Sequence, residues 1–199
     1  MIQSSLSSVL DALRPLMEQK APVLAAIDGR CASGKTTLAG HLQQTLNCPV
    51  VHMDHFFLRP EQRTPQRYQE PGGNVDRERF LEEVLRPLSL GQPVSYRPFL
   101  CHSRRLGEPL EIAPNGLVIV EGSYSCHPEL FPFYDLTIFL TLSPEAQRTR
   151  ILSRESAEKA ELFRTTWIPL EERYFSAFHI PQHCQLCLDT ASSNVLNII

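Results

Sequence analysis

The sequence predicts an α/β fold in which helices cover both faces of a parallel β-sheet. Short apolar runs of strand length alternate with longer amphipathic stretches along the chain, an order typical of parallel sheets. The 199 residues, 42% of them hydrophobic and 21% charged, are enough to bury one proper core. We therefore expect a single domain over residues 1–199 with three layers, α/β/α.

The elements are expected in a regular order. An amphipathic N-terminal helix over 4–19 precedes a strand over 22–28 and a helix over 35–46. A strand over 49–54 is followed by a loop over 55–75, rich in Pro, Gly and Arg, and long loops inside compact domains are often functional. A helix over 76–91 and a pair of short strands, over 93–100 and 107–112, come next. Two core strands over 116–122 and 135–142 are followed by a helix over 144–155 that Ser143 caps. A further helical stretch then leads to a last strand over 184–189.

Residues 29–37, GRCASGKTT, match the pattern Gly-x-x-x-x-Gly-Lys-Ser/Thr. Glycines let successive N–H groups converge on phosphate oxygens, Lys35 supplies a charge, and the Thr36 hydroxyl suits Mg²⁺. The strand before the loop and the helix after it stand in the required order, and the helix adds its positive N-terminal end. A glycine-rich turn that binds no ligand is the alternative. We expect a phosphate cradle formed by Gly29, Arg30, Cys31, Ala32, Ser33, Gly34, Lys35, Thr36 and Thr37.

Two acidic residues follow the apolar runs of neighbouring strands. Asp54 ends the second strand and Glu121 the third, and ligands of open α/β sheets bind at these carboxyl ends. Beside a phosphate loop, the Asp54 carboxylate can orient a hydroxyl and accept its proton during phosphoryl transfer. Glu121 can hold Mg²⁺ directly or through water. An Asp at a strand end is otherwise a turn former or a helix cap.

From about residue 22 to residue 189 the chain resembles the uridine kinase and phosphoribulokinase group of P-loop kinases. GRCASGKTT resembles the phosphate loop of this group, HMDHFF the strand end that carries its catalytic Asp, and VIVEGSYS the strand with its magnesium-associated Glu. The resemblance implies a P-loop NTPase fold of the nucleoside-kinase type with a helical lid. It also implies ATP and Mg²⁺ as cofactors, with Mg²⁺ near Thr36 and Glu121.

Two further segments resemble the family's acceptor site, within insertions at about 55–112. NVDRERF resembles a segment whose Asp contacts sugar hydroxyls of the acceptor, which gives Asp76 that role. YRPFLCHSR resembles the segment around the nucleoside base in uridine–cytidine kinases. The resemblance implies that the acceptor pocket is lined by Tyr96, Phe99 and His102.

RTRILSRE resembles the lid helix, whose arginines close over the phosphates, within a lid at about 150–166. Arg150 and Arg154 inherit that role, and their spacing of four puts them on one helical face, as a clamp on one anion requires. The chain departs from the family here, since Thr149 replaces the first Arg of the lid pair and Glu155 its closing Asp.

The acceptor segment also departs from the family pattern, because Arg97 and Pro98 stand where an acidic residue is expected, with one extra residue. Arg97 could bind an acceptor that carries a carboxylate or phosphate, together with the loop arginines Arg59, Arg63 and Arg67. The alternative for each is a solvated surface residue.

The resemblance implies a kinase that transfers the γ-phosphate of ATP to a small-molecule hydroxyl positioned by Asp54, with Lys35 stabilising the transferring group. Uridine, cytidine or a related nucleoside is the leading acceptor. Pantothenate, nicotinamide riboside, a sugar phosphate or glycerate are alternatives. A regulatory module that binds ATP without an acceptor is the alternative from another class, although a pure switch needs neither an acceptor base nor an acceptor pocket.

Composition bounds the partners and the compartment. A net charge of −3 gives no support to broad nucleic-acid or membrane binding. The chain has no run of eighteen apolar residues and its N-terminal stretch does not resemble a signal peptide, so we expect a cytoplasmic protein. Homo-oligomerisation is left open.

The six cysteines are scattered, as in a reduced intracellular protein. HCQLCLDT contains a Cys-x-x-Cys pair with His179 and His183 nearby, so a zinc site is one interpretation. There is no second pair at zinc-finger spacing. In a strand, Cys184 and Cys187 would point to opposite faces, which favours a buried terminal strand.

The stretch WIPLEERYFSAF, residues 167–178, places four apolar side chains near one helical face: Trp167, Leu170, Tyr174 and Phe178. Core packing of the helix before the last strand is the favoured interpretation of this face, and stacking on a nucleobase is the alternative.

Overall fold

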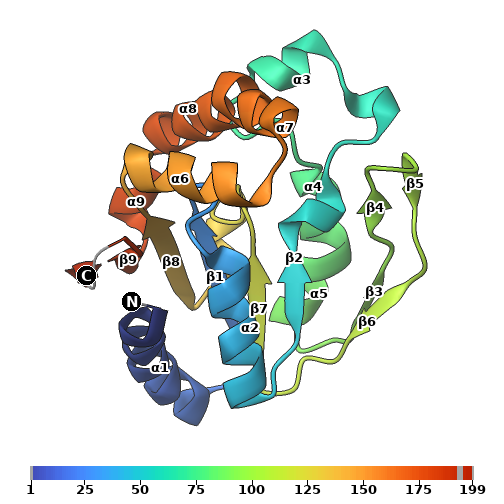
Figure 1. The fold of residues 1–199 in the computed structure, drawn as a ribbon. Coiled ribbons are helices and arrows are strands. Elements are labelled where there is room, and N and C mark those ends of the chain that lie inside the picture. The colour runs from blue at the N-terminus through green and yellow to red at the C-terminus, as the bar shows by residue number, and fades with distance from the viewer. Residues whose placement is uncertain (1, 192–194, 199) are drawn as a thin grey trace.

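A six-stranded sheet forms the centre of the molecule (Figure 1). The computed structural model describes residues 2–191 and 195–198, with side chains from residue 6 to residue 191. The strand order is β10-β9-β8-β1-β7-β2, and all neighbours are parallel except β10, which pairs antiparallel with β9. The strands are β1 (Val23–Gly29), β2 (Val50–His52), β7 (Leu117–Glu121), β8 (Leu136–Thr141), β9 (Leu186–Asp189) and β10 (Val195–Ile198).

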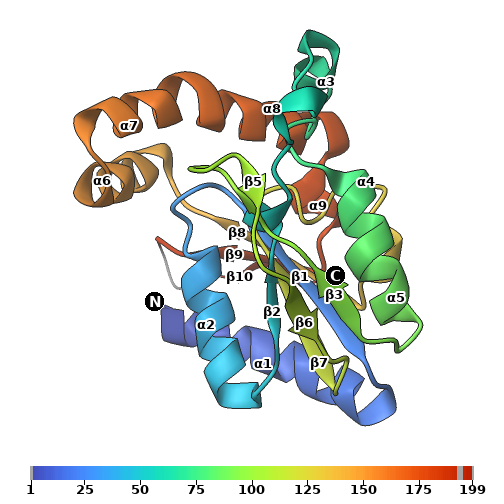
Figure 2. The same cartoon turned by 90° about the vertical axis from the view of Figure 1, so that its right-hand side faces the viewer.

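Helices cover both faces of this sheet, which confirms the predicted three-layer α/β/α fold. Figure 2 shows α1 (Ile2–Gln19) and α2 (Lys35–Leu46) on the opposite side of the sheet from the helical segment 77–89. Side chains alternate along β1, so that Leu24 packs in one core and Ala25 in the other. Two helical regions complete the core that contains Leu24. The first is the segment 77–89, which consists of α4 (Arg77–Phe80), a π-helical turn η3 (Leu81–Leu85) and α5 (Arg86–Ser89). The second consists of α8 (Ile168–Phe178) and α9 (Ile180–His183).

The five parallel strands lie within two residues of their predicted bounds, and β10 is the strand that the sequence does not predict. Buried parallel strands are continuous apolar runs that stand out in a sequence. Strand β10 lies at the edge of the sheet and pairs antiparallel with β9.

Three helical segments follow β8 and cross above the carboxyl ends of the strands (Figure 2). They are α6 (Pro144–Arg154), α7 (Ala157–Leu162) and a π-helical turn η5 (Phe163–Trp167) that continues into α8. The N-terminus of α6 has the predicted cap, because Ser143 Oγ accepts a 3.2 Å hydrogen bond from the Ala146 N–H. The region predicted as a lid therefore spans the end of α6, α7 and η5.

The segment between β2 and β7 is the most irregular part of the chain. It begins with the 3₁₀ turn η1 (Met53–Phe56), so Asp54 lies in a helical turn just after β2 instead of at the end of the strand. The predicted pair of short strands forms as two antiparallel ribbons, β3 with β6 and β4 with β5. The short elements of this segment are η2 (Pro60–Gln62), α3 (Pro65–Gln69), β3 (Val94–Tyr96), β4 (Phe99–Leu100), β5 (Arg105–Leu106) and β6 (Leu110–Ile112). One more short element, η4 (Phe131–Phe133), follows β7.

The Cys-x-x-Cys pair lies in the core. Strand β9 begins at Leu186, so the alternation expected between Cys184 and Cys187 does not apply, and both thiols pack in the same apolar cluster. The expectation that they face opposite sides is therefore wrong. Among the residues that the structure describes, no group of three or more His, Cys, Asp or Glu side chains is placed to hold a metal ion. No described helix is long and apolar enough to cross a membrane.

Candidate active site

A cavity of about 790 Å³ lies at the carboxyl ends of the parallel strands. Cys31, Ala32 and Gly34 of the phosphate loop form its floor, together with the start of α2. Asp54 and Glu121 line one side, and α6, α7 and η5 contribute Arg154, Lys159 and Trp167 to the other. The position matches the rule that ligands of open α/β sheets bind beyond the carboxyl ends of the strands.

The phosphate loop has the geometry of an anion cradle. Gly29 adopts φ 140°, and a Cβ there would lie 2.1 Å from the carbonyl oxygen of Leu140, so only glycine fits. Lys35 Nζ donates to the carbonyl oxygens of Gly29 (2.6 Å) and Arg30 (3.0 Å), which holds the ammonium group against the loop. Helix α2 begins at Lys35, after a glycine with no side chain to cap it, so its first N–H groups remain for an anion. These residues fit the phosphates of ATP.

The Thr36 hydroxyl and the Glu121 carboxylate come together, as a shared magnesium site requires. Thr36 Oγ1 donates to Glu121 Oε2 at 3.2 Å. On its other side, Glu121 Oε1 lies 2.5 Å from His52 Nδ1, and this hydrogen bond raises the pKa of His52. The hydroxyl and carboxylate oxygens are ligands that Mg²⁺ accepts. The sequence did not point to His52, which orients the glutamate.

Asp54 opens onto the same cavity from the turn after β2. Asp54 is an exposed residue by surface area, and protein atoms surround part of its carboxylate. This partial burial raises the pKa of Asp54, and the negative charge of Glu121 raises it further. A carboxylate with a raised pKa is a better proton acceptor than an ordinary Asp. Asp54, Lys35 and Glu121 therefore face one space, as the sequence predicts for neighbouring strand ends.

Helix α8 holds the phosphate loop through two adjacent glutamates. The Cys31 N–H donates to Glu171 Oε2 at 2.9 Å, and the Ser123 hydroxyl donates to Glu171 Oε1 at 2.6 Å. Glu172 forms a two-pronged ion pair with Arg30, at 2.7 and 3.0 Å. No motif in the sequence identified these contacts.

A buried carboxylate ties the same loop to the segment after β7. Asp28, at the end of β1, accepts hydrogen bonds from the N–H groups of Gly29, Tyr124 and Cys126, at 2.7 to 3.2 Å, and from the hydroxyl of Tyr174 at 2.9 Å. Complete burial raises the pKa of Asp28 to about 6 in spite of these donors.

The two lid arginines do not converge on one point. The Arg150 guanidinium donates to the carbonyl oxygens of Ala32 (3.1 Å) and Thr190 (2.8 Å), and Arg150 does not line the cavity. Arg154, one turn later, lines the cavity and pairs with Glu155 at 3.1 Å. In this structure Arg150 supports the phosphate loop from outside, and Arg154 is the lid arginine that faces the ligand space.

The residues expected around the acceptor lie elsewhere. Tyr96 and Phe99 are buried, and the Tyr96 hydroxyl lies 3.0 Å from His55 Nδ1. Arg97 Nε donates to the carbonyl oxygen of Gly107, and His102 is exposed in the turn after β4. None of the four lines the cavity.

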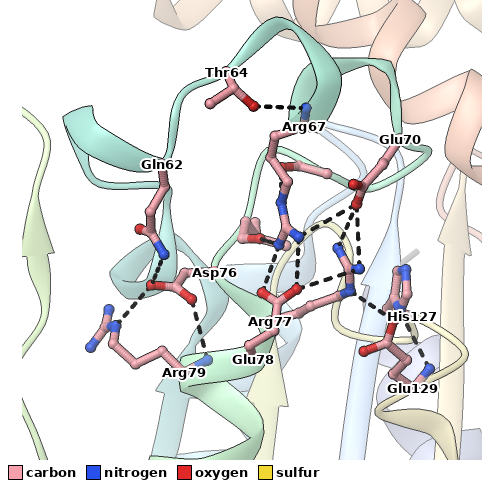
Figure 3. Close-up of polar contacts among 12 residues, drawn as sticks. Gln62, Thr64, Arg67, Glu70, Asp76, Arg77, Glu78, Arg79, His127 and Glu129 are labelled. Atoms are coloured by element: carbon pink, nitrogen blue, oxygen red, sulfur yellow. Dashed lines mark hydrogen bonds and ion pairs between the residues drawn. The ribbon is translucent and has the colours of Figure 1, made fainter.

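Asp76 is also fully engaged within the protein (Figure 3). Its carboxylate caps α4 by accepting from the Arg79 N–H, and it accepts from Gln62 Nε2 at 2.8 Å. Arg79 Nε lies 3.5 Å from the same carboxylate. In this structure the Asp76 carboxylate forms a helix cap that fastens η2 to α4.

Another set of side chains forms the wall near Asp54. It comes from several parts of the 55–75 segment and from the β4–β5 turn, and consists of Phe57, Leu58, Arg63, Tyr68, Asn74, Cys101 and Arg104.

No family model matches the chain. One curated relative, a uridine kinase from Brevibacillus brevis, is 24% identical over 150 residues, which are 69% of this chain and 68% of the relative. Among solved structures, a possible uridine kinase from Bacillus stearothermophilus matches with a TM-score of 0.63 and 18% identity, over 90% of this chain and 98% of that one.

Two more solved structures share the fold. A D-glycerate 3-kinase from Cryptococcus neoformans matches with a TM-score of 0.65 and 14% identity, over 99% of this chain and 98% of that one. A phosphoribulokinase from Rhodobacter spheroides matches with a TM-score of 0.57 and 13% identity, over 90% of this chain and 76% of that one. The fold is thus that of the P-loop kinases. Together the comparisons confirm the resemblance to the uridine kinase and phosphoribulokinase group.

Proposed function

We propose that the protein is an ATP- and Mg²⁺-dependent kinase that transfers the γ-phosphate of ATP to a hydroxyl of a small molecule. One observation carries this proposal. The carboxylate of Asp54 opens onto the same cavity as Lys35 of the phosphate loop and the Thr36–Glu121 pair. A nucleotide-binding loop alone would not require a carboxylate with a raised pKa across the ligand space.

Each residue has a defined task in this reaction. Asp54 orients the acceptor hydroxyl and receives its proton. Lys35 and Arg154 bind the anionic phosphates, and the first N–H groups of α2 add to the cradle. Thr36 and Glu121 would hold Mg²⁺, with His52 fixing the glutamate. When bound, ATP supplies the phosphoryl group and Mg²⁺ neutralises part of its charge.

The acceptor is the less defined half of the reaction. The name of the Brevibacillus brevis relative, uridine kinase, supports uridine as the acceptor. The base-binding role given to Tyr96, Phe99 and His102 has no support in the geometry, because these side chains lie outside the cavity. The other acceptors considered, which are pantothenate, nicotinamide riboside, glycerate and sugar phosphates, therefore stay in the test. All six cysteines are free thiols, and we propose the cytoplasm as the compartment.

Acceptor-dependent release of ADP tests the proposal. Purified protein with ATP and Mg²⁺ is assayed against uridine, cytidine, nicotinamide riboside, pantothenate, glycerate and ribulose 5-phosphate. We expect at least one acceptor to stimulate ADP release and to be recovered as its phosphate ester. ATP binding without acceptor-dependent release across this panel would contradict the proposal and favour a regulatory module.

A further inference from the structure

The arginines between β2 and β7 divide into two groups. Most of them pair with carboxylates; Arg67, for example, forms two 2.7 Å hydrogen bonds with Glu78, and Arg77 lies 3.0 Å from Glu129 (Figure 3). Among the described side chains, four arginines of this region have no carboxylate partner: Arg63, Arg97, Arg104 and Arg105. Of these four, Arg63 and Arg104 line the cavity.

Arg63 is held in place while its terminal nitrogens stay available. Its Nε donates to the carbonyl oxygen of Leu58 at 3.0 Å. Its guanidinium carbon lies 5.8 Å from the centre of the Phe99 ring, within the range of a cation–π contact. No other hydrogen bond or ion pair fixes this side chain within the described part of the chain, so its NH₂ groups can bind a ligand.

Arg104 belongs to the same corner of the cavity. Phe99, beneath Arg63, begins β4, and Arg104 ends the turn that joins β4 to β5. The Arg104 N–H donates to the carbonyl oxygen of Leu100 at 2.8 Å and its φ is 55°, so the turn is tightly closed. Arg104 from this turn and Arg63 from the end of η2 are both exposed side chains that line the cavity.

Asp54 lies within electrostatic range of this corner. Cys101, in the same turn, lines the cavity with both arginines. Burial raises the pKa of the Cys101 thiol, Arg63 lowers it and Asp54 raises it, because both charges act on the same sulfur. Asp54 and Arg63 therefore both act on a side chain of the β4–β5 turn, and both line the cavity together with Arg104.

Resting on the proposed kinase function, we infer that the acceptor is a small alcohol that carries a carboxylate or a phosphate, bound by Arg63 and Arg104 while Asp54 receives its hydroxyl proton. The acceptor oxygen forms the new bond to the γ-phosphorus, the bond from that phosphorus to the bridging oxygen breaks, and ADP leaves with the electron pair. A neutral nucleoside would leave both guanidinium groups without an anion.

Steady-state kinetics separate the two acceptor classes. D-Glycerate is the acceptor that carries a carboxylate, ribulose 5-phosphate is the acceptor that carries a phosphate, and uridine and cytidine are the neutral acceptors. We expect kcat/KM for one of the two anionic acceptors to exceed that of both nucleosides. Arg63→Gln and Arg104→Gln should each raise the KM of that acceptor about tenfold, the loss of one charge-assisted contact, with the KM of ATP unchanged within about twofold. Arg63→Lys should fall between wild type and Arg63→Gln because it keeps the charge.

The matched control is Arg105→Gln, since Arg105 is an exposed arginine of the same hairpin that does not line the cavity. It should leave the KM of the acceptor unchanged. The inference is overturned if uridine or cytidine is the preferred acceptor and the Arg63 and Arg104 variants behave like Arg105→Gln.

A binding measurement distinguishes failure of this inference from failure of the kinase proposal. Trp167 is the only tryptophan in the sequence and lines the cavity, so its fluorescence reports a ligand there. D-Glycerate and ribulose 5-phosphate are titrated against the protein with ADP and Mg²⁺. Saturable binding that Arg63→Gln and Arg104→Gln each weaken about tenfold, without any turnover, would support the anion site and contradict the kinase proposal. Turnover of an uncharged alcohol without anion binding would support the kinase proposal and contradict the anion site. If the protein neither binds nor turns over an anion, the inference is overturned.

Discussion

Glu171 of α8 accepts a 2.9 Å hydrogen bond from the backbone N–H of Cys31, so a side chain 140 residues away in the sequence fixes the phosphate loop. The same carboxylate accepts from the hydroxyl of Ser123, which follows Glu121 by two residues. Glu171 is buried, with 5% of its surface exposed. One carboxylate therefore sets the distance between the phosphate loop and the strand end that carries the proposed magnesium ligand.

Glu171→Ala should weaken ATP binding. Removal of the side chain leaves a buried N–H and a hydroxyl without their charged acceptor, and bonds to charged groups contribute about 1.5–3 kcal/mol, or roughly tenfold or more in affinity. Glu171→Gln keeps an acceptor for the Cys31 N–H and should lose less. Titration of ATP against Trp167 fluorescence measures both, with Glu18→Ala, an exposed position on α1, as the control. Equal affinity for the Ala and Gln variants would contradict a positioning role.

His52→Ala should raise the Mg²⁺ concentration needed for activity. His52 Nδ1 lies 2.5 Å from Glu121, and residues that orient a metal ligand contribute about 10–100-fold to metal affinity. The measurement is the Mg²⁺ concentration at half-maximal ADP release with ATP at saturation. His41→Ala, an exposed position on α2, is the control. An unchanged Mg²⁺ requirement would show that Glu121 needs no help from His52.

Asp28 predicts a pH dependence of stability. Burial raises its pKa from 3.8 to about 6, so the folded protein binds the proton more tightly than the unfolded chain does. The stabilisation by this proton is fully present below about pH 4 and is lost as the pH rises through about 6. The free energy of unfolding of the wild type should fall by roughly 3 kcal/mol across this window relative to Asp28→Asn, which does not titrate. Urea denaturation at several pH values measures this, and a flat difference would contradict the raised pKa.

The sheet and the phosphate loop could be predicted because their signals are local. Residues 23–27 are a continuous apolar run, and Gly29, Gly34 and Lys35 follow it at fixed spacing. The sequence also predicts that Asp54 and Glu121 lie close together, because parallel strands bring their carboxyl ends to one edge of the sheet.

The supporting contacts could not be predicted because they join segments far apart in the sequence. Glu171, Asp28 and His52 belong to no local pattern, and each acquires its role only when α8, β1, β2 and β7 are packed together. Arg150 shows the converse. Its spacing from Arg154 is right for one helical face, yet in the folded chain the Arg150 guanidinium donates to the carbonyl oxygens of Ala32 and Thr190 outside the cavity.

The position of the residues predicted around the acceptor also has a physical reason. The likeness around Tyr96 breaks at Arg97 and Pro98, and the chain there turns from β3 into a separate short ribbon, β4 with β5. This turn brings Cys101 and Arg104 to the cavity, while Tyr96 is buried against Phe56 and His55. Resemblance carries over residue types, whereas the direction of a side chain depends on the strand register.

Replacement of Asp54 tests the kinase proposal most directly. Asp54→Asn keeps the size of the side chain and removes its capacity to accept a proton. With ATP, Mg²⁺ and the best acceptor, the rate of ADP formation should fall about 10²–10⁴-fold, the usual contribution of a general base, while ATP affinity by Trp167 fluorescence stays within about threefold. Turnover equal to that of the wild type would contradict the assignment of Asp54 as the base and the mechanism built on it.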